Sequence, residues 1–161
     1  MAEFPFVSDV KVPTKDNELS LAEMSEALPD TATIMTRVGE CWWHLIYAAR
    51  GGNWGLADYY LRRVVKLENT LVTLRPKHRE RMARFQRQAV PPVLAAMEAQ
   101  DLEALEAAFQ AATDMANSLH GESGYSYIRW ELPGEPPKGL HLGAMEPAAD
   151  APSGNGQVGR Q

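Results

Sequence analysis

Three features of the chain predict an all-α fold, an antiparallel up-down-up-down four-helix bundle with extended N- and C-terminal arms. Apolar residues recur three and four positions apart in four segments of about 20 residues each. Very short connections that carry glycine or proline separate these segments, and residues that cap helices precede them. Amphipathic helices joined so closely must pack antiparallel to bury their apolar faces.

The first long helix is expected over residues 32–50, with Asp30 or Thr31 as its cap and Gly51 and Gly52 after its end. Its apolar stripe is expected to face the core. The stripe consists of Met35, Val38, Trp42, Leu45 and Ala49. Asn53 can then cap a second long helix by accepting a hydrogen bond from a first-turn amide, and the pattern continues to Pro76. The inward positions of this helix are Ala57, Tyr60, Val64, Leu67, Leu71 and Leu74.

The third helix is expected to begin near Lys77 and to carry Pro91 and Pro92 in its middle. Because proline lacks a backbone donor and its ring clashes with the preceding turn, this pair predicts a kink that opens a gap between helices. The predicted inward residues are Met82, Phe85, Val90, Val93 and Met97. Asp101 caps the fourth helix, whose stripe is Leu102, Leu105, Phe109, Ala112, Ala116 and Leu119.

The sequence also predicts how the chain is organised around these helices. Residues 1–16 contain prolines among apolar residues, which indicates an extended arm. Residues 17–132 form the helical domain, which includes a short preceding helix that starts near Asn17 and ends at Pro29, and an extended segment after Gly121. The apolar and aromatic side chains of this segment are available to pack back on the bundle: Tyr125, Tyr127, Ile128, Trp130 and Leu132. Residues 133–161 are expected to form a flexible tail, because alanine, proline, glycine, serine and glutamine dominate its later part.

Composition excludes several classes of protein. The chain has 161 residues, 45% of them hydrophobic, and a net charge of -5, as expected of one soluble domain. No apolar run approaches the roughly 18 residues of a spanning helix and the N-terminus lacks the pattern of a secretory signal, so we expect a cytoplasmic protein without a membrane partner. The single cysteine, Cys41, excludes an internal disulfide and multi-cysteine metal sites, and inert packing is its expected role.

Motifs for metals and nucleotides are missing from the sequence. The chain contains no E-x-x-H, no H-E-x-x-H and no G-x-x-x-x-G-K, so we expect no metal site and no nucleotide site of these kinds. Nine of the sixteen basic residues lie between Arg62 and Arg87, where the only acids are Glu68 and Glu80. Because the whole chain is acidic, this patch points to a solvated helix face, an acidic protein surface or an anionic substrate rather than to nucleic acid.

Two stretches of the chain resemble a known family. ECWWHLIYAARGGNWGLADYYLRRVVKLENTL and DLEALEAAFQAATDMANSLHGESGYSYIRW flank the helix with the proline pair. Together they resemble small bacterial bundle proteins of the cytochrome c-prime type over about residues 40–132. The resemblance implies an Asn-Trp turn, here Asn53-Trp54, and a fourth helix ending in C-x-x-C-H that holds haem. Here Ala116 and Leu119 replace both cysteines while His120 remains, so covalent haem is not expected.

Aromatic residues gather on the first long helix and at the turn that follows it. Trp43 and Tyr47 lie four residues apart and share a helix face that differs from the core stripe. Two interpretations remain open: this face packs under the N-terminal arm or a partner subunit, or it forms the wall of an inter-helix pocket for a flat apolar or aromatic ligand. The residues expected to bind such a ligand are Met35, Trp43, His44, Tyr47, Trp54 and His120.

Histidines supply the candidates for catalysis. Glu40 and His44 lie one turn apart and form either a proton-transfer dyad or a solvated surface pair. His120 ends the fourth helix and acts as a simple cap, as a ligand-contacting or catalytic imidazole, or as the axial ligand of non-covalent haem. The catalytic candidates are therefore His44, His120 and Glu40, with no cofactor expected other than this haem alternative.

The sequence thus favours a bundle that binds a small apolar or aromatic molecule, and it leaves open whether acid–base chemistry accompanies binding. A second hypothesis is an accessory or dimerising subunit of a cytoplasmic oxidoreductase or catabolic complex, in which the aromatic helix and the arms embrace a second copy or a partner protein. A third is a non-covalent haem protein that uses His120.

Overall fold

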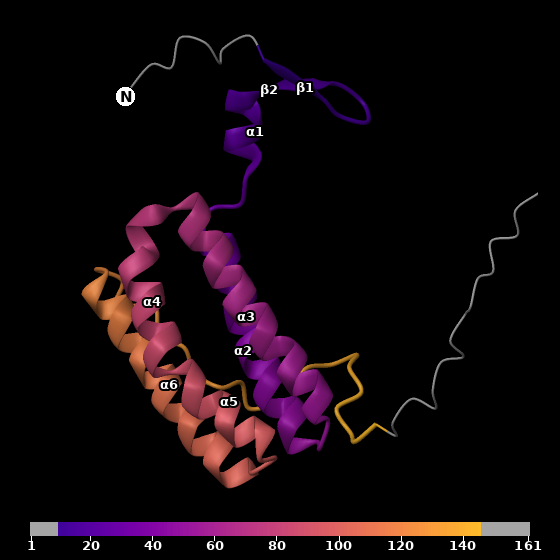
Figure 1. Cartoon of the computed structure of the whole chain (residues 1–161), viewed down its shortest axis with the longest axis vertical. Coiled ribbons are helices and arrows are strands. Elements are labelled where there is room, and N and C mark those ends of the chain that lie inside the picture. Colours follow the sequence, from indigo (N-terminus) through magenta and orange to yellow (C-terminus); the bar gives the residue numbers. More distant parts are fainter. Residues whose placement is uncertain (1–9, 146–161) are drawn as a thin grey trace, which may run out of the picture.

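A computed structural model describes residues 10–145 of the chain, and this part is predominantly helical (Figure 1). The helices α2 to α6 pack on one another and are called the helical body below. A two-stranded sheet and the short helix α1 precede it. The elements are β1 (Lys11–Pro13), β2 (Glu18–Ser20), α1 (Leu21–Ala27), α2 (Thr31–Arg50), α3 (Trp54–Leu74), a 3-10 turn (Pro76–His78), α4 (Arg79–Gln88), α5 (Val90–Glu98) and α6 (Leu102–Glu122).

The three long helices begin at the caps that the sequence predicts. In each, a side-chain oxygen of the residue before the helix accepts a hydrogen bond from a backbone N–H of the first turn, which would otherwise have no partner. The pairs are Asp30 with Thr33 (2.7 Å), Asn53 with Leu56 (3.1 Å) and Asp101 with Ala104 (3.0 Å). The helix starts are therefore confirmed to within one residue.

The expected third helix is interrupted just before the proline pair, at Ala89, whose backbone angles stay in the right-handed helical region (φ -96°, ψ -37°). Helix α4 ends at Gln88 and α5 begins at Val90, with Ala89 between them. Pro91 and Pro92 consequently lie in the first turn of α5, where the missing backbone donors have no intrahelical acceptor to lose. After the interruption, α5 packs against α6 and also contacts α3.

The core lies between α2, α3, α5 and α6, and Trp42 is at its centre. The ring of Trp42 stacks on Phe109 with centroids 4.9 Å apart and meets Phe85 edge to face at 6.0 Å. Its Nε1–H donates to Oγ1 of the buried Thr113 at 2.9 Å, and that hydroxyl donates to the Phe109 carbonyl at 2.8 Å. The indole donor is thus satisfied inside the core. Most of the predicted inward positions are buried, whereas seven are only partly buried: Met35, Tyr60, Leu67, Leu74, Met82, Val90 and Leu102.

The N-terminal segment differs from the expected arm and helix. Strands β1 and β2 pair antiparallel, with Lys11 opposite Ser20, so residues 18–20 are extended instead of helical. Ser20 then forms a capping box with Glu23, which explains why α1 begins at Leu21 and not near Asn17. Figure 1 shows this hairpin and α1 beyond the end of the helical body. Residues 1–9, to which most of the predicted arm belongs, lie outside the described residues.

The segment after α6 returns along the helical body. The Tyr47 hydroxyl donates to the Pro133 carbonyl, and Asn53 Nδ2 donates to the His141 carbonyl at 3.2 Å. Gly52 forms an antiparallel bridge with Gly143. Residues 133–145 of the predicted flexible tail are therefore attached to α2 and to the α2–α3 turn, and residues 146–161 lie outside the described part. Within residues 10–145, no helix is both long and apolar enough to cross a membrane.

Candidate functional site

The aromatic face of α2 is covered by a side chain from the returning segment. The rings of Trp43 and Trp130 meet edge to face with centroids 5.9 Å apart, and Trp130 also meets the His120 ring edge to face at 5.5 Å. Gly39 permits this packing, because a Cβ atom there would lie 2.9 Å from Cη2 of Trp43 and 3.4 Å from Cζ2 of Trp130. The indole of Trp130 therefore occupies the face that was predicted to be covered by an arm or a ligand.

Trp130 is held in place through its backbone. The Asn117 side chain of α6 donates from Nδ2 to the Trp130 carbonyl at 3.0 Å, and its Oδ1 accepts from the Trp130 N–H at 2.7 Å. His120 adds a third anchor, since its Nδ1 lies 3.1 Å from the Ile128 carbonyl. A carbonyl only accepts, so Nδ1 carries the proton, and burial lowers the pKa of His120, which favours the neutral ring. His120 thus positions the returning segment.

The Glu40–His44 pair is not joined by a hydrogen bond among the described residues. Glu40 Oε2 accepts instead from Arg37 Nη1 at 2.6 Å. His44 meets the ring of Tyr60 on α3 edge to face at 5.0 Å, and burial lowers its pKa although Glu40 opposes this effect.

The predicted ligand-binding residues are divided between different parts of the helical body. Trp43 and His120 meet at Trp130, whereas His44 faces Tyr60. Met35 and Trp54 are half-buried and pack against the core. Neither of the two cavities described below is lined by any of the six residues.

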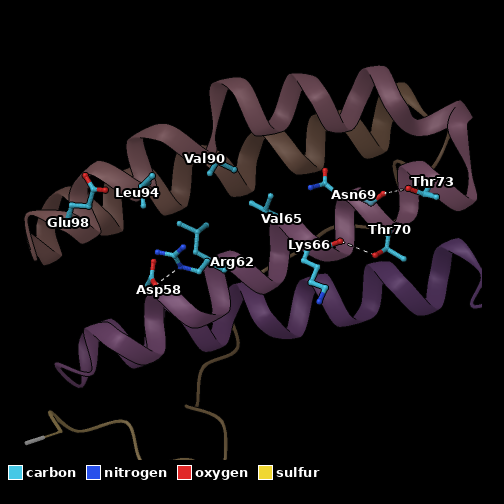
Figure 2. A pocket seen from close by; sticks show the side chains of 11 residues that line it. Asp58, Arg62, Val65, Lys66, Asn69, Thr70, Thr73, Val90, Leu94 and Glu98 are labelled. Carbon is cyan, nitrogen blue, oxygen red and sulfur yellow. Dashed lines mark hydrogen bonds and ion pairs between the residues drawn. The ribbon is translucent and has the colours of Figure 1, made fainter. Parts of the chain in front are cut away.

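The larger cavity is an open groove between α3 and α5, which we call the α3–α5 groove (Figure 2). Its volume is about 670 Å³. Helix α3 lines it with Asp58, Leu61, Arg62, Val65, Lys66, Asn69, Thr70 and Thr73, and α5 with Val90, Leu94 and Glu98. Val90 and Leu94, which follow the interruption at Ala89, form part of the second wall.

The polar groups of the groove differ in how far they are already paired. Arg62 Nε donates to Asp58 Oδ2 at 2.7 Å, and the Thr70 and Thr73 hydroxyls donate to carbonyls of their own helix at 3.0 Å. No ion pair of the described residues involves Lys66, which is exposed. Lys66 is therefore a lining cation without an ion-pair partner among the described residues, and Val65 and Leu94 line the same groove.

Glu68 is a buried carboxyl group that the sequence reasoning missed. Only 2% of its surface is exposed, and Gln86 Nε2 of α4 donates to its Oε2 at 2.9 Å. Burial raises the pKa of Glu68 to about 7, although the hydrogen bond from Gln86 opposes that rise. The helical spacing indicates the burial of Glu68, because it follows Val64 by four residues and precedes Leu71 by three on the core stripe.

A smaller cavity of about 350 Å³ lies between α4 and α6, and Arg84 and Glu122 on its rim form an ion pair.

Cys41 is half-buried, and burial raises the pKa of its thiol, so the reactive thiolate is disfavoured. Among the described residues no group of three or more histidine, cysteine, aspartate or glutamate side chains is placed to hold a metal ion.

Comparisons of this chain with protein-family models, with curated proteins and with solved structures gave no match. The likeness to cytochrome c-prime bundles therefore stays a prediction.

Proposed function

We propose that the protein is a binding protein for a small amphipathic acid, a molecule with an apolar or aromatic body and one anionic group, and that the α3–α5 groove is its site. One observation carries the proposal: Lys66, which is exposed and takes part in no ion pair of the described residues, lines an open groove together with Val65 and Leu94. The volume of about 670 Å³ is within the range of roughly 300–1,000 Å³ that is typical of ligand sites.

The groove replaces the site that the sequence predicted. Trp43 and His120 were expected to border a pocket, but Trp130 lies against both rings. The α3–α5 groove remains as the place for a ligand. Two of the nine basic residues between Arg62 and Arg87, namely Arg62 and Lys66, line it together with the carboxylates Asp58 and Glu98, and Lys66 attracts the anionic group. Binding is proposed without a reaction, because Glu40 is paired with Arg37 and lies apart from the groove.

The finer architecture belongs to the same proposal. Helices α2, α3, the broken pair α4–α5, and α6 correspond to the four segments of an up-down-up-down bundle. Short connections at Gly51–Asn53 and at Ala99–Asp101 support antiparallel neighbours, and α2 packs on α3 as α5 packs on α6. Descent from a cytochrome c-prime-like bundle and a cytoplasmic location complete this view of the protein.

Fluorescence of 8-anilinonaphthalene-1-sulfonate, an aromatic anion, tests the proposal directly. We expect saturable binding that decanoate displaces, and we expect Leu94→Asp to weaken it at least tenfold, which corresponds to about 1.4 kcal/mol. Ala95→Asp introduces the same charge at the neighbouring exposed position, which does not line the groove, and should leave binding unchanged. Equal effects of the two variants would overturn the assignment of the groove.

A second candidate function, an accessory or dimerising subunit, is favoured by the exposed apolar face of α1. Leu21 and Met24 are 36% and 38% exposed, although both are apolar residues on a helix.

Non-covalent haem at His120 fits the described geometry poorly. Nδ1 is engaged by the Ile128 carbonyl, Trp130 packs against the ring, and neither described cavity adjoins the histidine. Titration with haemin tests this alternative. A Soret band that His120→Ala removes would establish haem binding, whereas a band of equal size in both proteins would reject His120 as the ligand.

A further inference from the structure

The hairpin and α1 form a small unit, residues 10–28, that stands apart from the core. No residue of α1 is buried, and α1 packs on β2. Leu21, Met24 and Leu28 follow one another at intervals of three and four residues and therefore share a face. Their exposed fractions are 36%, 38% and 45%. From here on, the name N-terminal arm refers to this unit of residues 10–28 and no longer to the predicted arm of residues 1–16. The three residues are called its apolar stripe.

The N-terminal arm is too small to account for its own stability. Two strands of three residues and a helix of seven form one hydrogen-bonded hairpin and two turns of helix. Isolated two-stranded hairpins and helices shorter than about 12 residues are marginal in water. An amphipathic helix that exposes its apolar face is therefore expected to bury that face against another surface.

The connection to α2 keeps the arm away from its own helical body. Pro29 restricts Leu28 to extended backbone, and Leu28 has ψ 144°. Asp30 is also extended, with ψ 174°, because its side chain caps α2. Both residues on either side of Pro29 thus direct α1 beyond the end of α2, as Figure 1 shows. Folding α1 back onto its own α3–α5 groove would require this connection to reverse.

The α3–α5 groove matches the apolar stripe in size and in chemistry. The seven residues of α1 span about 10 Å, and the lining of α3 from Asp58 to Thr73 spans about 22 Å of helix. Its apolar side chains include Leu94, which is itself 37% exposed. An amphipathic helix that lies in such a groove uses anchors at this spacing.

The N-terminal arm and the helices near the groove differ in net charge. Residues 10–28 carry four carboxylates and two lysines, whereas residues 62–87 carry nine lysines and arginines and two glutamates. Of those two glutamates, Glu68 is buried. The groove itself is lined by the cations Arg62 and Lys66 and by the carboxylates Asp58 and Glu98, and Arg62 is paired with Asp58. Pairing one arm with another arm would bring like charges together, whereas pairing the arm with α3 and α4, which carry most of the basic residues, brings opposite charges together.

We propose that the N-terminal arm of one chain lays its apolar stripe in the α3–α5 groove of a second copy, and that the exchange is reciprocal. Each chain then gives one arm and receives one, so two identical contacts close a twofold dimer. The inference rests on the proposed function, since both require the groove to accept an apolar occupant of acidic character. It adds that a small amphipathic acid and the arm of the second copy compete for the groove.

Sedimentation of the full chain tests the dimer. We expect a dimer whose dissociation constant rises at least tenfold in Met24→Asp and in Leu94→Asp. The matched controls Ala22→Asp, which lies off the stripe on α1, and Ala95→Asp should sediment as the wild type does. A wild-type chain that remains monomeric at 100 μM, or controls that dissociate the dimer equally, would overturn the proposal. Circular dichroism of each variant checks that the helices remain folded.

A cysteine experiment distinguishes exchange between chains from folding back within one chain. In a Cys41→Ser background, one tagged chain carries Met24→Cys and an untagged chain carries Leu94→Cys. After mixing and oxidation, we expect a covalent dimer that contains one chain of each kind, which only contact between copies can produce. The double variant in one chain gives the opposite readout: a disulfide within the monomer, with no mixed dimer, would show that the arm binds its own groove and would reject the exchange.

The two proposals fail in different ways. A monomeric wild-type chain that binds 8-anilinonaphthalene-1-sulfonate in a Leu94-dependent manner rejects the dimer and retains the proposed function. The opposite result has two parts: the mixed disulfide dimer forms, and the separate Met24→Asp variant, as a monomer, binds neither this probe nor decanoate. That result rejects the small ligand and supports the arm as the occupant of the groove. If both are correct, Met24→Asp binds the probe more tightly than the wild type, because the competing arm has left the groove.

Discussion

The indole of Trp130 meets the indole of Trp43 edge to face at a centroid separation of 5.9 Å, with the interplanar angle at 74°. This contact joins a residue near the C-terminal end of the described chain to the first long helix. It also places a side chain of the protein itself on the surface that looked most like a ligand site in the sequence. The stability of the returning segment therefore depends on the aromatic face of α2.

Replacing Trp130 tests that dependence. We expect Trp130→Ala to lower the free energy of unfolding by about 2 kcal/mol, below the range of about 3–5 for a fully buried tryptophan, because Trp130 is only partly buried. Urea titration followed by circular dichroism measures the loss. Tyr127→Ala removes a ring that is 78% exposed in the same segment and should change stability by less than about 0.5 kcal/mol. Equal losses would contradict the role given to Trp130.

Much of the helical architecture follows from local signals. Asp30, Asn53 and Asp101 begin helices because a single side-chain oxygen satisfies a first-turn donor, and that chemistry involves only three neighbouring residues. The apolar stripes that contain Trp42 and Phe109 can be predicted in the same way, since a period of 3.6 residues defines one face of each helix. Such features need no knowledge of distant contacts.

The covering of the aromatic face needed information that the sequence does not carry locally. Trp130 reaches Trp43 only because Asn117 and His120 hold the segment that follows α6, and these contacts join residues separated by eight to thirteen positions without any periodic pattern. The hairpin of the N-terminal arm was missed for a similar reason. Its strands have three residues each, which is too short for a pattern of alternation to be recognised.

Two glycines give a paired test of the contact between the returning segment and the end of α2. A Cβ atom at Gly51 would lie 2.0 Å from the Leu142 carbonyl oxygen, so Gly51→Ala must displace that backbone. At Gly55, in the first turn of α3, a Cβ atom meets nothing within 4 Å, and alanine has the higher helix propensity. We expect Gly55→Ala to stabilise the protein by up to about 1 kcal/mol and Gly51→Ala to destabilise it.

Hydrogen exchange separates the glycine effects by location. Gly51→Ala should speed exchange at Gly143 and at neighbouring amides of the returning segment, because the bridge between Gly52 and Gly143 is disturbed. Gly55→Ala should leave those amides as they are. If the amides of the returning segment exchange at the same rate in both variants, the close approach of Leu142 to Gly51 is wrong.

His120 offers a spectroscopic report on the same cover. Burial lowers its pKa, and the hydrogen bond to the Ile128 carbonyl opposes that effect. Removing the ring of Trp130 exposes the imidazole, so Trp130→Ala should raise the pKa of His120 towards the ordinary value of histidine. Titration of the imidazole protons by NMR measures the change, and His44, which packs on Tyr60, serves as the internal control. A pKa of His120 that does not move would show that Trp130 does not bury it.

Glu68 makes stability depend on pH in a direction opposite to that of the buried histidines. Its pKa is raised from 4.5 to about 7, so between these values the native state binds more protons than the unfolded state. The free energy of unfolding therefore falls as the pH rises from 4.5 to 7, by up to about 3 kcal/mol, and is level above that window. His44 and His120, whose pKa values are lowered, contribute an opposite slope below their ordinary value, so a single pH profile of the wild type mixes both effects.

Comparison of Glu68→Gln with the wild type isolates the carboxyl group, because the histidine contributions cancel in the difference. The glutamine side chain is neutral at every pH and retains an oxygen that can accept from Gln86. Its stability relative to the wild type should therefore be greater at pH 8 than at pH 5, by up to about 3 kcal/mol, as measured by urea unfolding at both values. Glu80→Gln removes an exposed carboxylate from the start of α4 and should show a small, pH-independent difference. A Glu68→Gln difference that is equally independent of pH would mean that Glu68 is ionised in the native protein at pH 5, in conflict with the desolvated position beside Gln86.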